Sequence, residues 1–158
     1  MTTIIWPELY RPENCAVHVV NELAMDAPPD AVWNCLVHAS AWPDWYPNAA
    51  NVVVRDAPDG RLTGGAAFRW KTFGVTIDSK VEEFVPNERI AWSASAFGID
   101  VYHAWLIIPT SQGCKVVTEE TQNGILARLG QLLRPRRMHK FHQIWLENLC
   151  ERAKQGER

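Results

Sequence analysis

The chain has 158 residues, with 16 Lys and Arg against 18 Asp and Glu, so its net charge is −2. A hydrophobic fraction of 47% and a charged fraction of 22% are typical of a globular domain and exclude a disordered chain, a collagen and a long coiled coil. The length favours a single domain. The near-neutral charge argues against a nucleic-acid binder that depends on its overall field.

We expect neither stable membrane insertion nor a secretory signal. Every apolar run is broken by polar residues well short of the ~20 needed to span a bilayer. The segment Met1–Tyr10 has no basic start and meets Pro7 too soon for a signal sequence. The four cysteines are far apart and form no CxxC pair, which argues against a zinc site and a dense disulfide framework. We therefore predict reduced thiols, a cytoplasmic location and no cofactor.

The chain begins with an arm and a strand. Pro7 and Pro12 interrupt any regular element in residues 1–14, so we predict an irregular arm there and one domain over residues 15–155. The β-branched run Cys15–Met25 alternates in polarity and predicts a strand.

Two short helices are predicted next. The segment Pro28–Asp30 is typical of a helix start, with Asp26 as the N-cap and the helix ending near Ser40. The segment Trp42–Pro47 predicts a second short helical or turn segment.

Six further strands are bounded by Gly, Pro, Asn and Asp residues typical of turns. Their short connections require antiparallel neighbours, because a parallel crossover needs a dozen or more residues. The predicted strands are Asn51–Asp56, Ala66–Thr72, Val75–Val85, Arg89–Phe97, Val101–Ile108 and Lys115–Gln122.

The C-terminal part has helical periodicity from Gly124 to about Lys154, interrupted at Pro135, and its apolar residues are expected to share one face. An antiparallel sheet of six to seven strands and one long apolar-faced helix bury both surfaces only if the sheet curls around the helix. We therefore predict an α+β fold with a cavity between sheet and helix.

Several segments, in this order and spacing, resemble the START-like, Bet v 1-like (SRPBCC) helix-grip superfamily and its polyketide cyclase/dehydrase-type branch. The resemblance covers about residues 16–154 and implies a hydrophobic cavity for lipids, sterols, polyketides or other apolar molecules. The superfamily includes enzymes, carriers and co-chaperone-like proteins, and it has no invariant catalytic set to transfer. The matching segments are Pro28–Trp33, Trp42–Pro47, Val81–Trp92, Gly113–Thr121 and Trp145–Leu149, with Gly124 before the last helix.

The cavity wall is predicted from strand alternation. A hairpin closed at Pro86–Arg89 would place Val81 opposite Ala94, and the small side chains of Ser79, Ala94 and Ala96 leave room for a ligand. The tryptophans favour a flat aromatic or polycyclic ligand, unless they simply fill the core. The predicted wall comprises Phe68, Trp70, Ile77, Ser79, Val81, Trp92, Ala94, Ala96, Trp105, Thr118, Phe141 and Trp145.

The last hairpin carries the candidate catalytic pair. With the turn at Pro109–Cys114, His103 lies directly opposite Glu120, and Cβ atoms of opposed residues approach to about 5 Å. A His–Glu pair in an apolar pocket is suited to acid/base chemistry next to a carbonyl. Two alternatives remain: the pair orients a ligand, or its two side chains only hydrogen-bond to each other within the sheet and have a structural role.

The start of the last helix carries histidines and a basic cluster. His139 and His142, three residues apart, are able to share a helix face, but no third metal ligand is evident, so we predict no metal. The basic cluster is either solvated or binds an acidic protein partner or anionic lipid. Its residues are Arg134, Arg136, Arg137, His139 and Lys140.

Three functions remain open. The first is binding of a small hydrophobic, aromatic or polycyclic molecule in the cavity. The second is cofactor-free polyketide cyclisation or dehydration by His103 and Glu120, in which the cavity folds the substrate and excludes water. The third is a regulatory or co-chaperone-like module that binds proteins through its basic cluster.

Overall fold

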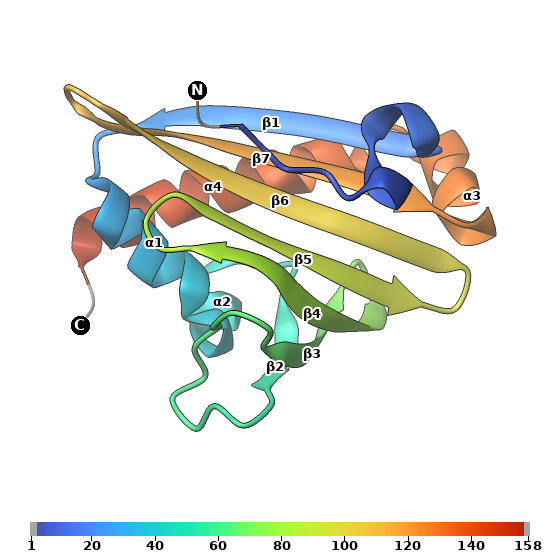
Figure 1. Ribbon diagram of the computed structural model, residues 1–158, viewed down its shortest axis with the longest axis horizontal. Coiled ribbons are helices and arrows are strands. Elements are labelled where there is room, and N and C mark those ends of the chain that lie inside the picture. Colours follow the sequence, from blue (N-terminus) through green and yellow to red (C-terminus); the bar gives the residue numbers. More distant parts are fainter. Residues whose placement is uncertain (1–2, 157–158) are drawn as a thin grey trace.

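The computed structural model describes residues 3–156 as one curled seven-stranded sheet with helices on its concave side (Figure 1). The strand order is β1-β7-β6-β5-β4-β3-β2, and every neighbouring pair is antiparallel. The predicted α+β helix-grip fold is therefore confirmed. The strands are β1 Val17–Met25, β2 Ala50–Val54, β3 Ala67–Thr72, β4 Val75–Val85, β5 Arg89–Ala96, β6 Ile99–Thr110 and β7 Gly113–Asn123.

The helices are α1 Pro29–Val37, α2 Trp42–Trp45, α3 Ile125–Leu133 and α4 Arg137–Gln155. Short 3-10 turns occupy Glu8–Tyr10, Pro12–Asn14 and Ala39–Ala41. Within residues 3–156, no helix is long and apolar enough to cross a membrane. The prediction that Asp26 caps the first helix is wrong, because Pro28 occupies the N-cap and Asp26 pairs with Lys154 at 2.7 Å.

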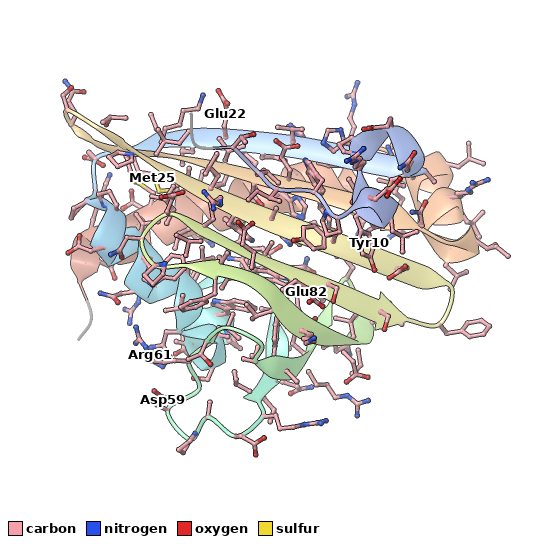
Figure 2. The ribbon with its side chains drawn as sticks, viewed as in Figure 1. Tyr10, Glu22, Met25, Asp59, Arg61 and Glu82 are labelled. Atoms are coloured by element: carbon pink, nitrogen blue, oxygen red, sulfur yellow. The ribbon has the colours of Figure 1, made fainter. Side chains whose placement is uncertain are left out.

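The N-terminal arm lies on the outer face of the sheet, opposite α4 (Figure 1). Tyr10 stacks on Tyr102 of β6 with ring centroids 5.2 Å apart, and its hydroxyl donates to Asp100 at 2.9 Å. Figure 2 shows Tyr10 and Glu82 on this outer face. The arm therefore covers apolar positions that an open antiparallel sheet would expose to water.

The inner face is half filled by the segment that contains α1 and α2. Trp42 is completely buried, and its ring lies 5.2–5.9 Å from the rings of Phe68, Trp70, Trp92 and Trp145. Its indole N–H donates to the Leu36 carbonyl at 3.0 Å, so the tryptophan is fixed by packing and by a hydrogen bond. This part of the curled sheet is solid core.

The strand registers follow the predictions at one hairpin and depart from them at another. His103 pairs with Glu120 in the β6–β7 hairpin, as predicted. Val81, by contrast, pairs with Trp92 and not with Ala94. Val85 rather than Pro86 lies opposite Arg89, and a bulge at Glu82 adds one residue to β4, so each difference moves the partner of Val81 by one residue. A bulge bends its strand and increases the local twist, which the closure of the sheet requires.

The C-terminal segment forms two helices whose apolar residues do not share one face. Gly124, with φ of 110°, makes the turn from β7, and a Cβ there would lie 2.2 Å from the Gly98 carbonyl oxygen. After the break at Arg134–Arg136, α4 packs against the inner face of the curled sheet, whereas α3 exposes apolar side chains to solvent. The exposed residues are Ile125, Leu126, Leu129, Leu132 and Leu133.

Candidate functional site

A cavity of about 360 Å³ lies between the inner face of the sheet, α3 and the first turns of α4. Helix α3 forms its roof through Leu126, Ala127, Gly130, Gln131 and Leu133. The volume falls within the range of about 300–1,000 Å³ that small-molecule sites occupy. The cavity occupies the half of the curled sheet that α1 and α2 leave unfilled.

Aromatic rings form much of the cavity wall. Trp70 and Trp92 come from β3 and β5, and Trp145 comes from α4. Tyr46 stacks on Trp145 with centroids 4.3 Å apart and an interplanar angle of 16°. The planes of Trp70 and Trp92 lie at 60° and 42° to that of Trp145. Because packed neighbours hold these rings, the wall is a rigid set of aromatic faces.

The predicted wall residues separate into two groups. Trp70, Ile77, Trp92, Ala94 and Trp145 line the cavity. Most of the others pack into the filled half, Ser79 accepts the Trp70 indole hydrogen bond at 3.1 Å, and Phe141 packs on Phe73. The predicted residues outside the cavity lining are Phe68, Ser79, Val81, Ala96, Trp105, Thr118 and Phe141.

The polar end of the cavity is a buried cluster of His103, Glu120 and His142, hereafter the His–Glu–His cluster. Glu120 Oε2 lies 3.1 Å from His103 Nδ1 and 3.2 Å from His142 Nε2. The other carboxylate oxygen accepts from the Gln122 amide at 2.6 Å, and His103 Nε2 lies 2.7 Å from Thr118 Oγ1. The predicted opposition of His103 and Glu120 thus becomes a direct contact.

Burial controls the charge of this cluster. Desolvation lowers the pKa of His103 to about 3, against the opposing effect of the Glu120 carboxylate, so the imidazole is neutral near pH 7. Burial alone would raise the pKa of Glu120, but His103, His142 and Gln122 together lower it to about 2. The cluster therefore holds a carboxylate anion beside a neutral imidazole.

His142 is the residue of the candidate site that the sequence interpretation did not place there. It lies on the buried side of α4, whereas His139 is exposed, so the two do not form one site. The argument that His142 lacks further ligands nearby is wrong, because folding brings it to His103 and Glu120. Its spacing of three residues before Trp145 and four before Leu146 places it on the apolar stripe of the helix, which was the available signal.

Two polar atoms of cavity residues have no partner. The indole N–H of Trp145 and Nδ1 of His142 are buried and form no hydrogen bond within the described part of the chain. An unpaired buried polar group costs about 1–3 kcal/mol. A hydrogen-bond partner for either atom would therefore stabilise the folded protein.

The basic cluster lies at the junction of α3 and α4, beside the cavity. Arg134 and Arg137 contribute to the cavity lining, and the Arg137 guanidinium lies 5.1 Å from the centre of the Phe73 ring. Arg136, His139 and Lys140 are exposed. One end of the cavity is therefore positively charged.

Comparisons with known proteins agree with this architecture. The family model described as polyketide cyclase / dehydrase and lipid transport matches residues 16–153. No curated protein matches the chain. Among solved structures, the hypothetical protein jhp0584 from Helicobacter pylori is 29% identical, with a TM-score of 0.89 over 97% of both chains.

Two further solved structures share the fold at lower identity. The di-domain ARO/CYC StfQ from the steffimycin biosynthetic pathway is 18% identical, with a TM-score of 0.71 over 88% of this chain and 51% of StfQ. This chain thus spans about half the length of that di-domain protein. A START superfamily protein from Mycobacterium smegmatis is 14% identical, with a TM-score of 0.70 over 87% of this chain and 97% of that one.

Proposed function

Since the chain belongs to the polyketide cyclase/dehydrase and lipid-transport family of START-like proteins, as its resemblance predicted, we propose that it binds a small, planar, mostly apolar molecule in the cavity beneath α3. The observation that carries this proposal is the cavity itself, about 360 Å³ in volume and walled by Trp70, Trp92 and Trp145. Flat, rigid rings favour a flat partner, because stacking adds to the burial of apolar area.

The polar end of the cavity supports a ligand that carries oxygen. The unpaired indole N–H of Trp145 needs a hydrogen-bond acceptor. Nδ1 of His142, whose other ring nitrogen faces the Glu120 carboxylate, needs a hydrogen-bond donor. A phenolic hydroxyl or a carbonyl conjugated to the ring system would satisfy one or both. We therefore propose a hydroxylated or carbonyl-bearing aromatic or polycyclic molecule rather than a plain hydrocarbon or a flexible acyl chain.

We propose binding ahead of catalysis because the polar atoms of the predicted catalytic pair, His103 and Glu120, already have partners within the protein. Both ring nitrogens of His103 have partners, Glu120 and Thr118, and both carboxylate oxygens of Glu120 have theirs. A general base must reach the proton it removes. In the enzymatic alternative, a cofactor-free cyclase or dehydratase, His142 Nδ1 is the nitrogen left free to take that proton.

Tryptophan fluorescence tests the proposal, because three indoles line the cavity. We expect saturable quenching by 2-naphthol, with affinity at least about threefold higher than for naphthalene, since a retained hydrogen bond contributes about 1 kcal/mol. Oleate and cholesterol serve as the flexible and the bulky comparison. Stronger binding of either of these would contradict the proposed ligand class, and no response to any of the four would contradict the cavity as a binding site.

A second candidate function rests on the surface around α3, and we propose that this face docks on an anionic membrane surface. Ile125 is 81% and Leu132 78% exposed on α3, and Phe97 is 93% exposed on the neighbouring turn. Residues 121–146 contain no Asp or Glu but five Lys or Arg. An apolar helix face bordered by basic residues fits the interface of a negatively charged bilayer. The protein partner predicted for the basic cluster would be the alternative occupant.

Vesicle co-sedimentation tests this second candidate. We expect binding to phosphatidylglycerol-containing vesicles but not to pure phosphatidylcholine, and about a tenfold loss for Leu132→Glu. Val53→Glu is the matched control, because Val53 is 66% exposed on β2 at the other edge of the sheet. Equal binding to both vesicle types, or an equal loss in both variants, would contradict docking through α3.

A further inference from the structure

In the His–Glu–His cluster, two imidazoles contact the same carboxylate oxygen, an arrangement that hydrogen bonding alone does not require. Two imidazole nitrogens from different elements, β6 and α4, converge on the same oxygen of Glu120 at 3.1 and 3.2 Å. The three ligand atoms all lie within 4.8 Å of one another, and all three residues are buried. From this convergence we propose that His103, Glu120 and His142 form a binding site for a divalent transition-metal ion of the zinc class.

The separations support a shared ion. Zinc binds imidazole nitrogen and carboxylate oxygen at about 2.0–2.2 Å, which places neighbouring ligand atoms about 3.4 Å apart in a tetrahedral site. The two contacts to Glu120 are already close to this separation. Two imidazoles and one carboxylate also form the donor set that zinc, iron and nickel prefer over magnesium or calcium.

The surrounding hydrogen bonds also fit a metal site. With an ion on Nδ1 of His103, its Nε2–H donates to Thr118 Oγ1 at 2.7 Å and fixes the ring. Gln122 holds Glu120 Oε1 at 2.6 Å and leaves Oε2 directed at the two imidazoles. His103 and Glu120 are therefore each held by a hydrogen bond at the atom that would not contact the ion, Nε2 and Oε1.

The charge balance favours a cation. The hydrogen-bond partners of the Glu120 carboxylate are two imidazoles and an amide, none of which carries a permanent positive charge. A buried carboxylate without a full counter-charge is costly.

The site opens onto the cavity, because all three residues belong to its lining. Three protein ligands leave a tetrahedral ion one free position, which is the arrangement of open rather than purely structural sites. That position would accept an oxygen of the bound molecule. This last step rests on the proposed function, whereas binding of the ion itself does not.

Titration of the ligand-free protein with Zn²⁺ in a calorimeter, and with Co²⁺ followed by visible absorption, tests the site. We expect one equivalent to bind, and affinity to fall at least about tenfold in Glu120→Gln and His142→Ala. His139→Ala is the matched control, because this histidine lies three residues earlier on the same helix and is exposed.

Three results would overturn the metal site. They are the absence of stoichiometric binding by the unaltered protein, unchanged affinity in His142→Ala, and an equal loss in His139→Ala. If His142→Ala does not fold, the cobalt spectrum of the unaltered protein decides, since nitrogen ligation in a distorted tetrahedral site gives intense visible bands and binding to exposed groups does not. Quenching by 2-naphthol in chelator-treated protein is measured separately, so failure of the metal site and failure of the ligand site are distinguishable.

Discussion

Replacing Trp42 with alanine is expected to lower the free energy of unfolding by about 3–5 kcal/mol, the typical cost of a large-to-small change at a fully buried aromatic residue. Trp42 is completely buried and contacts four other aromatic side chains from β3, β5 and α4. The substitution removes those contacts and leaves a void at the centre of the filled half of the core. Urea denaturation followed by circular dichroism measures the effect.

Trp6→Ala is the control for this measurement. Trp6 lies on the arm, is only partly buried and contacts Tyr102 and His18 on the outer face. Its replacement is expected to cost about 1 kcal/mol. Equal costs at the two positions would contradict the view that Trp42 fills the curled sheet and supports the cavity beside it.

Replacing Ala94 with phenylalanine is expected to abolish ligand binding while leaving the protein folded. Ala94 is buried on β5 and its side chain lines the cavity, with Ser79 and Val101 as its strand neighbours. A phenyl ring there would occupy the space of one ring of a planar ligand. We expect affinity for 2-naphthol to fall by more than about a hundredfold, because the cavity is near the lower size limit for such sites.

Ser95→Phe is the matched control on the same strand. Ser95 is the next residue along β5, and its exposed side chain points to the opposite face of the sheet. This variant is expected to bind 2-naphthol with unchanged affinity. Unchanged binding by Ala94→Phe, measured in a sample with a native circular dichroism spectrum, would mean that the ligand does not enter this cavity.

Local rules were sufficient to predict the strands and one contact of the candidate site. The turn at Pro109–Cys114 fixes the register of β6 and β7, so the opposition of His103 and Glu120 follows by counting from the turn. The alternation in Val75–Val85 likewise identifies the buried face of β4 up to Val81.

The rest of the site depends on interactions that sequence spacing does not contain. The β4–β5 hairpin closes on Val85 and Arg89, one residue from the predicted closure, and the bulge at Glu82 moves the partner of Val81 by a second residue, to Trp92. A bulge has no simple pattern in a single sequence. Which half of the curled sheet is filled is decided by where Trp42 packs, so the predicted wall extended into solid core.

The C-terminal helices show the same limit. Helical periodicity identified the segment, but the break at Pro135 separates α3 from α4, and α3 then covers the cavity with its apolar stripe exposed. His142 was interpreted with its neighbour His139, three residues away, although its partners lie on β6 and β7. Contacts between a helix and distant strands form only when the sheet curls.

The indole ¹H–¹⁵N spectrum of the protein with and without 2-naphthol tests the central claim most directly, because each of the eight tryptophans gives its own signal. We predict saturable shifts of the Trp70, Trp92 and Trp145 signals, which come from the cavity wall. The signals of Trp6 on the arm and Trp33 on α1 are expected to stay unchanged. Shifts confined to Trp6 and Trp33, or no shifts at saturating concentrations, would contradict the cavity as the functional site.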